Sequence, residues 1–182
     1  MPCINFTYEN KGFLTLMIGP SGAGKTTFIN KYVNLAGLYA PEGKPNPLTI
    51  HKPNSQTLYS PWIVSPDDLR EELTGDRSNQ RQNKSVFELA HLRVAERLAS
   101  GKHVIFDATN LRESSRTVLA YLADHKHFQY IVLDRKYKKP WHGNMDVVRR
   151  HEQQFANELP RILAGDGFGN CIVHDLRYKF DD

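Results

Sequence analysis

Residues 19–26 read Gly-Pro-Ser-Gly-Ala-Gly-Lys-Thr, and this short run constrains the fold of the 182-residue chain more than any other feature. It fits the pattern G-x-x-x-x-G-K-[S/T] at every fixed position. The apolar run Phe13–Ile18 precedes it and predicts a strand buried on both faces, and a helical pattern over residues 24–35 follows it. A strand, this loop and a helix in that order predict a phosphate-binding loop.

The residue types in this loop suit a nucleoside triphosphate. Gly22 and Gly24 can adopt backbone angles that turn successive N–H groups toward one anion, and the following helix adds its positive end. Lys25 is expected to reach the β- and γ-phosphates, and Thr26 to offer its hydroxyl to Mg²⁺. The residues predicted to bind ATP are Ser21, Gly22, Ala23, Gly24, Lys25, Thr26 and Thr27.

The rest of the chain alternates between strand and helix patterns. Further strands are predicted at 61–64, 103–107, 130–134 and 171–174, and further helices at 65–74, 85–100, 114–124 and 146–163. The helix at 85–100 is expected to bury a stripe made of Phe87, Ala90, Val94, Ala95 and Leu98. The alternation predicts an α/β fold of the P-loop NTPase type, with a parallel sheet of about five strands and helices on both faces.

Composition and length are those of one soluble domain. The 40% hydrophobic and 24% charged residues are ordinary values, so we expect residues 1–182 to form a single domain with a loop insertion at 37–60. Phe13–Ile18 is the longest nearly apolar run and is far too short to span a membrane, and the N-terminus does not resemble a signal peptide. Cys3 and Cys171 indicate neither a disulfide framework nor a zinc site. These features predict a cytoplasmic protein, and they leave its oligomeric state open.

Residues elsewhere in the chain narrow the chemistry. The Asn-Lys pairs at 30–31 and 83–84 are not followed by the residues of a guanine-binding signature, which disfavours a GTPase. Asp107 is followed by Ala-Thr-Asn rather than by the glutamate that activates water in many motor ATPases. A phosphotransferase needs instead a base for an acceptor hydroxyl and cations for the moving phosphoryl group.

Acidic residues at the ends of two predicted strands supply such a base. Asp67 and Asp68 follow the strand at 61–64 and Asp107 is the last residue of the strand at 103–107, so all three can face the phosphate loop. Arg70 lies three residues beyond Asp67, on the same face of a helix, where it can bind an anion on the acceptor. The predicted catalytic residues are Lys25, Asp67 and Arg70, and the predicted Mg²⁺ ligands are Thr26 and Asp107.

Three segments together resemble the 5′-kinase domain of polynucleotide kinases, most closely the bacterial and phage kinase modules of RNA end-repair systems. They are Gly19–Thr27, Ser65–Arg70 and Phe106–Leu111, and the resemblance extends from about Phe13 to Val173. It implies transfer of the ATP γ-phosphate to the 5′-hydroxyl of RNA or DNA in the cytoplasm, or in the host cytoplasm for a phage protein. Any other end-repair activities would reside on separate enzymes.

The resemblance also implies roles for individual residues. Asp67 would be the general base, and Arg70 would hold the phosphate next to the acceptor hydroxyl. The family has a lid whose arginines close over ATP, and the basic segment 135–150 is the candidate for it. The candidate substrate or lid residues are Asn110, Arg116, Lys138, Lys139, Arg149 and Arg150.

Other functions are compatible with the same motifs. A kinase of the same architecture could act on a small hydroxylated metabolite or a nucleoside, and an ATP-bound switch or assembly module would not transfer a phosphoryl group at all. The net charge of +4 suits a polyanionic partner without requiring one. Residues 135–142, with Tyr137 and Trp141 among basic residues, can bind a nucleic acid or form an ordinary solvated loop.

Overall fold

The computed structural model describes residues 12–34, 62–140 and 143–179. The predicted insertion at 37–60 lies outside the described residues, as do Trp141 and His142 of the basic segment.

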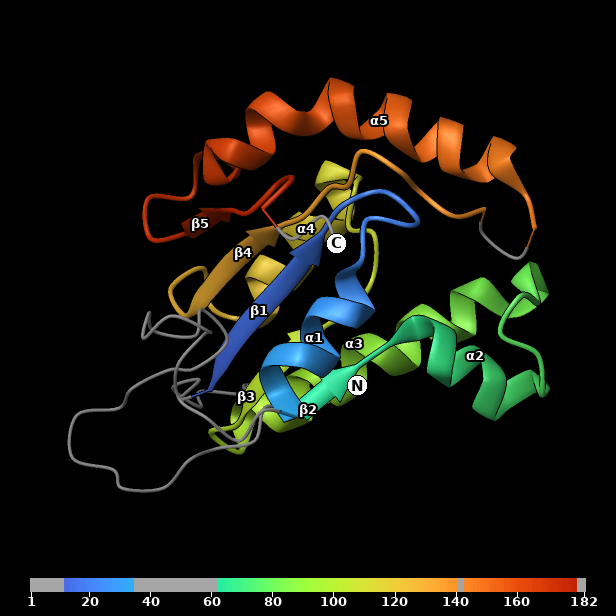
Figure 1. The fold of residues 1–182 in the computed structure, drawn as a ribbon. Coiled ribbons are helices and arrows are strands. Elements are labelled where there is room, and N and C mark those ends of the chain that lie inside the picture. The colour runs from blue at the N-terminus through green and yellow to red at the C-terminus, as the bar shows by residue number, and fades with distance from the viewer. Residues whose placement is uncertain (1–11, 35–61, 141–142, 180–182) are drawn as a thin grey trace.

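The described strands form one parallel sheet (Figure 1). They are β1 (Phe13–Ile18), β2 (Trp62–Val64), β3 (His103–Phe106), β4 (Phe128–Val132) and β5 (Ile172–Asp175). Their spatial order is β2-β3-β1-β4-β5, and each neighbouring pair is parallel, which confirms the predicted α/β sheet. β1 therefore lies in the centre, where both faces are covered, and this explains its continuous apolar sequence.

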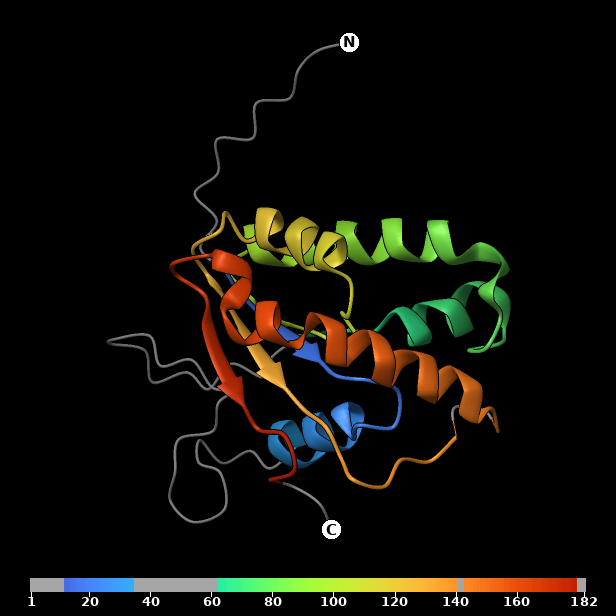
Figure 2. The ribbon, with the colours of Figure 1, turned by 90° about the horizontal axis from the view of Figure 1, so that it is seen from above.

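Helices cover both faces of the sheet. They are α1 (Lys25–Asn34), α2 (Pro66–Thr74), α3 (Asn83–Ala99), α4 (Glu113–Leu122) and α5 (Met145–Leu163), with the 3₁₀ turns η1 (Gln80–Gln82) and η2 (Gly165–Gly167). Figure 2 shows the layers: α1 lies on one side of the sheet, and α3 and α4 lie on the other. Along β1, Leu14 and Leu16 join the core under α3 and α4, whereas Met17 joins a smaller core under α1.

Two elements, β4 and α3, begin two residues before their predicted starts. β4 starts at Phe128 and not at Tyr130, because the polar Gln129 is buried inside the strand, where its amide donates to the Thr15 hydroxyl. α3 starts at Asn83 because the turn η1 leads directly into it. Its buried positions are Val86, Ala90, Val94 and Leu98, whereas Phe87 and Ala95 of the predicted stripe are only half-buried.

The topology brings the predicted site residues to one edge of the sheet. The phosphate loop follows β1, α2 with Asp67 follows β2, and Asp107 follows β3. Parallel strands present their carboxyl ends at the same edge, where ligands bind in open α/β sheets. Figure 1 shows α5 arching over this region, above the ends toward which β1 and β4 point.

Within the described ranges, no helix combines the length and the apolar character needed to cross a membrane.

Candidate active site

The phosphate loop makes its turn through two glycines in the left-handed region. Gly22 has φ +81° and Gly24 has φ +85°, values that a residue with a Cβ atom rarely adopts. α1 begins at Lys25, immediately after this turn, so its free N–H groups face the concave side of the loop. The arrangement of backbone dipoles suits an anion, as the sequence pattern predicts.

Lys25 is folded back onto the loop. Its Nζ donates to the carbonyl oxygens of Gly19 at 2.9 Å and Pro20 at 2.8 Å. Burial lowers the pKa of this ammonium to about 8, and the carboxylate of Asp107 acts in the opposite direction. A buried cation bonded only to carbonyl oxygens is ready to exchange them for phosphate oxygens.

Thr26 and Asp107 form a pair of oxygen donors beside the loop. The Thr26 hydroxyl donates to Asp107 Oδ2 at 2.9 Å. Burial raises the pKa of the Asp107 carboxyl, while Lys25 and the Thr26 hydroxyl oppose that rise. A carboxylate and a hydroxyl at this spacing are the hard oxygen ligands that Mg²⁺ takes alongside phosphate and water. The donor set therefore fits the predicted metal.

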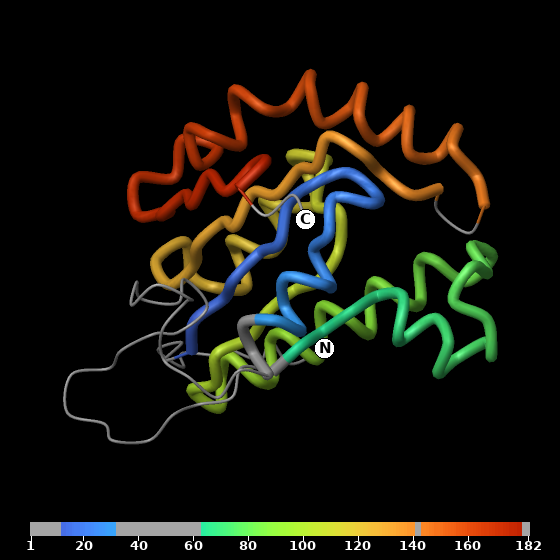
Figure 3. The backbone as a smooth tube through the Cα atoms, viewed as in Figure 1, coloured from blue at the N-terminus to red at the C-terminus, as the bar shows by residue number. Residues whose placement is uncertain are grey.

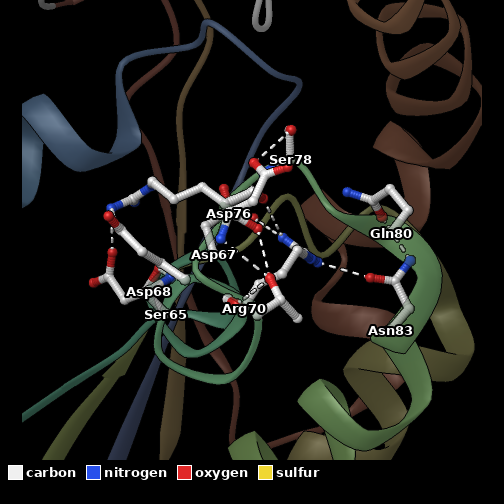
Figure 4. Close-up of polar contacts among 11 residues, drawn as sticks. Ser65, Asp67, Asp68, Arg70, Asp76, Ser78, Gln80 and Asn83 are labelled. Carbon is white, nitrogen blue, oxygen red and sulfur yellow. Dashed lines mark hydrogen bonds and ion pairs between the residues drawn. The ribbon is translucent and has the colours of Figure 1, made fainter.

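Asp67 and Arg70 form an ion pair in the first turns of α2 (Figure 4). Two features fix the start of this helix: the Ser65 side chain accepts from the N–H of Asp68, and Pro66 occupies the first helical position. Arg70 also donates to the carbonyl of Arg77 at 3.2 Å and to Asn83 Oδ1 at 2.8 Å.

Asp68 has a different position from its neighbour. It is exposed and pairs with Arg77 at 2.7 Å. Of the two aspartates in this turn, only Asp67 lines the cavities described next.

Two cavities meet at the phosphate loop. The smaller, of about 380 Å³, is lined by the loop itself together with Arg77, Arg135, Tyr137 and Lys139. The larger, of about 780 Å³, lies between α2, α3, α4 and α5. The residues common to both linings are Ser21, Asp67, Asp107, Ala108 and Thr109. The predicted base and the predicted metal ligand Asp107 thus stand where the two cavities join.

The segment after β4 covers the phosphate loop, and Figure 3 shows it running beside the loop. A Cβ atom on Gly24 would lie 2.5 Å from the Arg135 guanidinium, and one on Gly22 would lie 3.0 Å from Lys138 Cβ. The Arg135 guanidinium therefore lies directly against the phosphate loop, although the sequence singled out other residues of this segment. Its only sequence signal is its place in the basic run.

The four predicted cations of segment 135–150 have different environments. The ammonium of Lys138 is largely buried and pairs with Asp134 and Glu152, both at 2.8 Å, so it is not offered to a ligand. Arg149 is exposed and pairs with Asp146 on the outer side of α5. By contrast, Lys139 lines the smaller cavity and Arg150 lines the larger one.

Arg116 and Asn110 both bond to other groups of the protein. The Arg116 side chain has no exposed surface, and its guanidinium binds Asp166 through two nitrogens at 2.7 and 2.8 Å and Glu158 at 2.9 Å. Asn110 borders the larger cavity, but its amide donates to the Met17 carbonyl at 2.7 Å. Both side chains thus have partners inside the protein, and their roles toward a substrate or in a lid stay predictions.

His151 is a site residue that the sequence did not indicate. It lies in α5, lines the larger cavity, and its Nδ1 is 2.8 Å from the Ser21 hydroxyl. The two residues are 130 positions apart, so no local pattern could reveal their contact.

Comparisons with known proteins agree with this geometry at the level of fold. A chain of the Pnkp1/Rnl/Hen1 RNA repair complex has a TM-score of 0.57 and 16% identity, over 82% of this chain and 46% of that one. This chain thus spans less than half the length of that relative. A gluconokinase from Sinorhizobium meliloti 1021 has a TM-score of 0.48 and 14% identity, over 90% of this chain and 82% of that one.

No curated protein sequence matches the chain. A family model described as an AAA domain, AAA_33, matches residues 14–160, which run from β1 through most of α5. With its phosphate loop, parallel sheet and covering helices, the chain has the fold of a P-loop kinase, and it belongs to the AAA_33 family of AAA domains.

Proposed function

We propose that this protein is an ATP-dependent polynucleotide kinase, which transfers the γ-phosphate of ATP to the 5′-hydroxyl end of RNA or DNA. One observation carries the proposal: a large, basic cavity meets the phosphate loop at the carboxylate of Asp67. A kinase requires this arrangement, because the donor phosphate and the acceptor hydroxyl must meet beside a group that can take a proton.

The smaller cavity is the proposed donor site. Its lining contains the loop from Ser21 to Thr27 apart from Ala23, with Arg135 and Lys139 on the opposite side. Lys25 would exchange its two carbonyl partners for the β- and γ-phosphates. Thr26 and Asp107 would hold Mg²⁺, which when bound neutralises part of the phosphate charge.

The larger cavity is the proposed acceptor site, and its charge favours an acceptor that carries phosphate. Its acidic lining residues are Asp67 and Asp107, both at the junction with the donor site. Its basic lining residues, apart from two histidines, are Arg70, Lys84, Arg112 and Arg150. Arginine forms paired hydrogen bonds with phosphate oxygens, and a neutral sugar would leave this excess of positive charge without a partner. The shared fold of a chain from an RNA repair complex also supports a nucleic-acid acceptor.

The chemistry follows from the ion pair in α2. In the absence of substrate, Arg70 holds the Asp67 carboxylate at the junction of the cavities. An acceptor phosphate would compete for the Arg70 guanidinium and leave Asp67 free to accept the proton of the adjacent hydroxyl. The hydroxyl oxygen then bonds to the γ-phosphorus, the bond to the bridging oxygen breaks, and ADP leaves. The arginine thereby couples acceptor recognition to the availability of the base.

A graded series of acceptors tests this proposal. The protein is incubated with γ-labelled ATP, Mg²⁺ and, in turn, a nucleoside, a nucleoside 3′-phosphate and a 5′-hydroxyl oligonucleotide. We expect label on the oligonucleotide and on the nucleoside 3′-phosphate, and much less on the nucleoside. Equal labelling of all three, or label on the nucleoside alone, would show that the phosphate adjacent to the hydroxyl is not what the cavity recognises.

Two neighbouring aspartates provide a matched pair of variants. Asp67→Asn is expected to lower kcat about 10²- to 10⁴-fold while ATP still binds, because the amide cannot accept the proton. Asp68→Asn should keep nearly all activity, since Asp68 pairs with Arg77 at the surface. If Asp67→Asn leaves the biological function intact, the protein is an ATP-bound switch or assembly module and not a kinase.

A further inference from the structure

Ser21 occupies a special place in the phosphate loop. It lines both cavities, so it lies at the junction of the proposed donor and acceptor sites. Its hydroxyl is 2.8 Å from Nδ1 of His151 in α5. A histidine that contacts the loop from the acceptor side can decide which way the serine proton points.

The two neutral forms of His151 have opposite effects on Ser21. With the proton on Nδ1, the imidazole donates to the serine oxygen, and the serine proton is free to bond a phosphate oxygen. With the proton on Nε2, the serine must donate to Nδ1, so its proton cannot bond to a phosphate oxygen. A phosphate oxygen that accepts the serine proton favours the first neutral form. Its negative charge also favours the protonated imidazole, which donates from Nδ1 in the same way.

The environment of His151 changes when phosphates enter. Without them, burial, Lys25 and Arg150 lower its pKa, so the imidazole is neutral near pH 7. The triphosphate reverses the electrostatic part of that effect, because it places negative charge beside the same ring. The other charged or titratable side chains that line the larger cavity are Asp67, Arg70, Lys84, His91, Asp107 and Arg112.

The same turn of α5 also holds the segment that covers the loop. Glu152, next to His151, pairs with Lys138, and Lys138 lies against Gly22. Consecutive residues of α5 therefore contact the phosphate loop and its covering segment. This double attachment fixes the position of the imidazole relative to Ser21.

We propose that His151 is a positioning residue for the donor nucleotide, which directs the Ser21 hydroxyl proton to the terminal phosphate and takes up a proton when the nucleotide binds. The inference rests on the nucleotide-binding part of the proposed function and is independent of the acceptor. Nucleotide affinity should therefore rise as the pH falls from about 7.5 toward the depressed pKa of the empty site, because the complex binds more protons than the free protein.

Calorimetry without any acceptor tests this directly. A non-hydrolysable ATP analogue with Mg²⁺ is titrated into the protein at pH 6.5, in two buffers that differ in ionisation enthalpy, so that the number of protons taken up is measured. The variants are His151→Asn, whose side-chain amide can occupy the place of Nδ1 but cannot titrate, His151→Ala, Ser21→Ala and the double Ala variant. Gln153→Ala is the control, since Gln153 is an exposed neighbour that bonds only to Asn157 of the same helix among the described contacts.

The wild type and Gln153→Ala should take up more protons than either His151 variant. His151→Asn should keep its affinity within about twofold, whereas His151→Ala and Ser21→Ala should each lose about three- to tenfold. The double variant should lose no more than either single one, because the same hydrogen bond is removed in all three.

Equal proton uptake by the wild type and His151→Asn would overturn the proposal, and so would losses that add in the double variant. Failure to bind the nucleotide at all would refute both this inference and the proposed kinase. If the nucleotide binds with the expected proton uptake but no oligonucleotide is labelled, the proposed transfer to a nucleic acid is refuted and the inference about His151 stands.

Discussion

Arg70 has almost no exposed surface, yet its guanidinium binds groups from three separate parts of the chain. It pairs with Asp67 in its own helix, donates to the carbonyl of Arg77, and donates to Asn83 at the start of α3. Its Nε atom is buried without a hydrogen-bond partner in the described part of the chain. A planar group with several donors can serve all these sites at once, whereas a lysine ammonium offers a single charged point.

Arg70→Lys should therefore not behave as a conservative change. We expect phosphoryl transfer to fall at least about tenfold and the free energy of unfolding to fall by about 1–3 kcal/mol, because one or more partly buried acceptors lose their donor. Kinase assays and urea unfolding measure the two effects. Arg81→Lys, at an exposed position of η1, should change neither by more than about 0.5 kcal/mol. Wild-type behaviour of Arg70→Lys would contradict the role given to the guanidinium.

At the scale of one element, α2 determines where Asp67 lies. Ser65 caps its N-terminus, Pro66 fills the first position, and Gly75 ends it with φ +74°. These signals are local, so the sequence predicts this helix and the relation between Asp67 and Arg70 well. The bond from Asp68 N–H to the Ser65 hydroxyl is long, at 3.4 Å, and so is weaker than a typical cap.

Ser65→Ala should cost about 0.5–1 kcal/mol of unfolding free energy, at the low end for a helix cap. Urea unfolding measures the loss, and Ser100→Ala at the exposed end of α3 is the control, expected to stay within about 0.5 kcal/mol of the wild type. A loss above about 2 kcal/mol for Ser65→Ala would mean that the hydroxyl does more than cap the helix.

Elements and site residues with local signals were predictable from the sequence, and those with distant partners were not. The phosphate loop and β1 lie in one continuous segment, and their predicted positions are confirmed. The sequence predicts that Lys138 and Arg116 can bind a ligand, because both side chains are basic. Their carboxylate partners include Glu152 and Asp166, which are brought close only by the fold.

At the scale of the whole molecule, buried polar groups join elements that the hydrophobic cores alone would not fix. Arg116 of α4 binds Asp166, which follows α5, and the same carboxylate accepts from the Tyr130 hydroxyl of β4 at 2.7 Å. Burial and that carboxylate raise the pKa of Tyr130. The Asp166 side chain is only 2% exposed, so these partners replace the water that would otherwise bond to its oxygens.

Arg116→Met should reduce the free energy of unfolding by about 3–5 kcal/mol, because it leaves a buried carboxylate without a cation. Arg161→Met is the matched control: Arg161 pairs with Glu113 between the same two helices, but at the surface, and its loss should cost at most about 1 kcal/mol. Thermal or urea unfolding compares the two. Similar losses for both variants would show that burial does not determine how much the Arg116 ion pairs contribute to the free energy of unfolding.

A second polar chain crosses the sheet from strand to strand. His103 of β3 bonds to Thr15 of β1, Gln129 of β4 donates to Thr15, and His174 of β5 bonds to Gln129. Burial lowers the pKa of His103 to about 4. The folded protein therefore keeps this imidazole neutral, with its ring nitrogen free to bond to the threonine hydroxyl.

This chain makes stability depend on pH. The His103 pKa is depressed by folding, so its contribution is complete above about pH 6.5 and is lost as the pH falls from 6.5 to 4, by up to about 3 kcal/mol. His103→Gln keeps a hydrogen-bonding group without titrating, so its unfolding free energy should fall less over that range. His127→Gln, at an exposed position, should follow the wild type. Identical slopes for wild type and His103→Gln would mean that folding does not depress the pKa of His103.

The wall shared by the two cavities has a consequence for the order of events in catalysis. Apart from Ser21, Asp67 and residues 107–109, the two cavities have separate linings, so a molecule in one leaves the other open. Neither substrate would have to depart before its partner arrives. Each turnover would then pass through a ternary complex with both substrates. The phosphoryl group would be transferred directly between them, without a phosphorylated form of the protein as an intermediate.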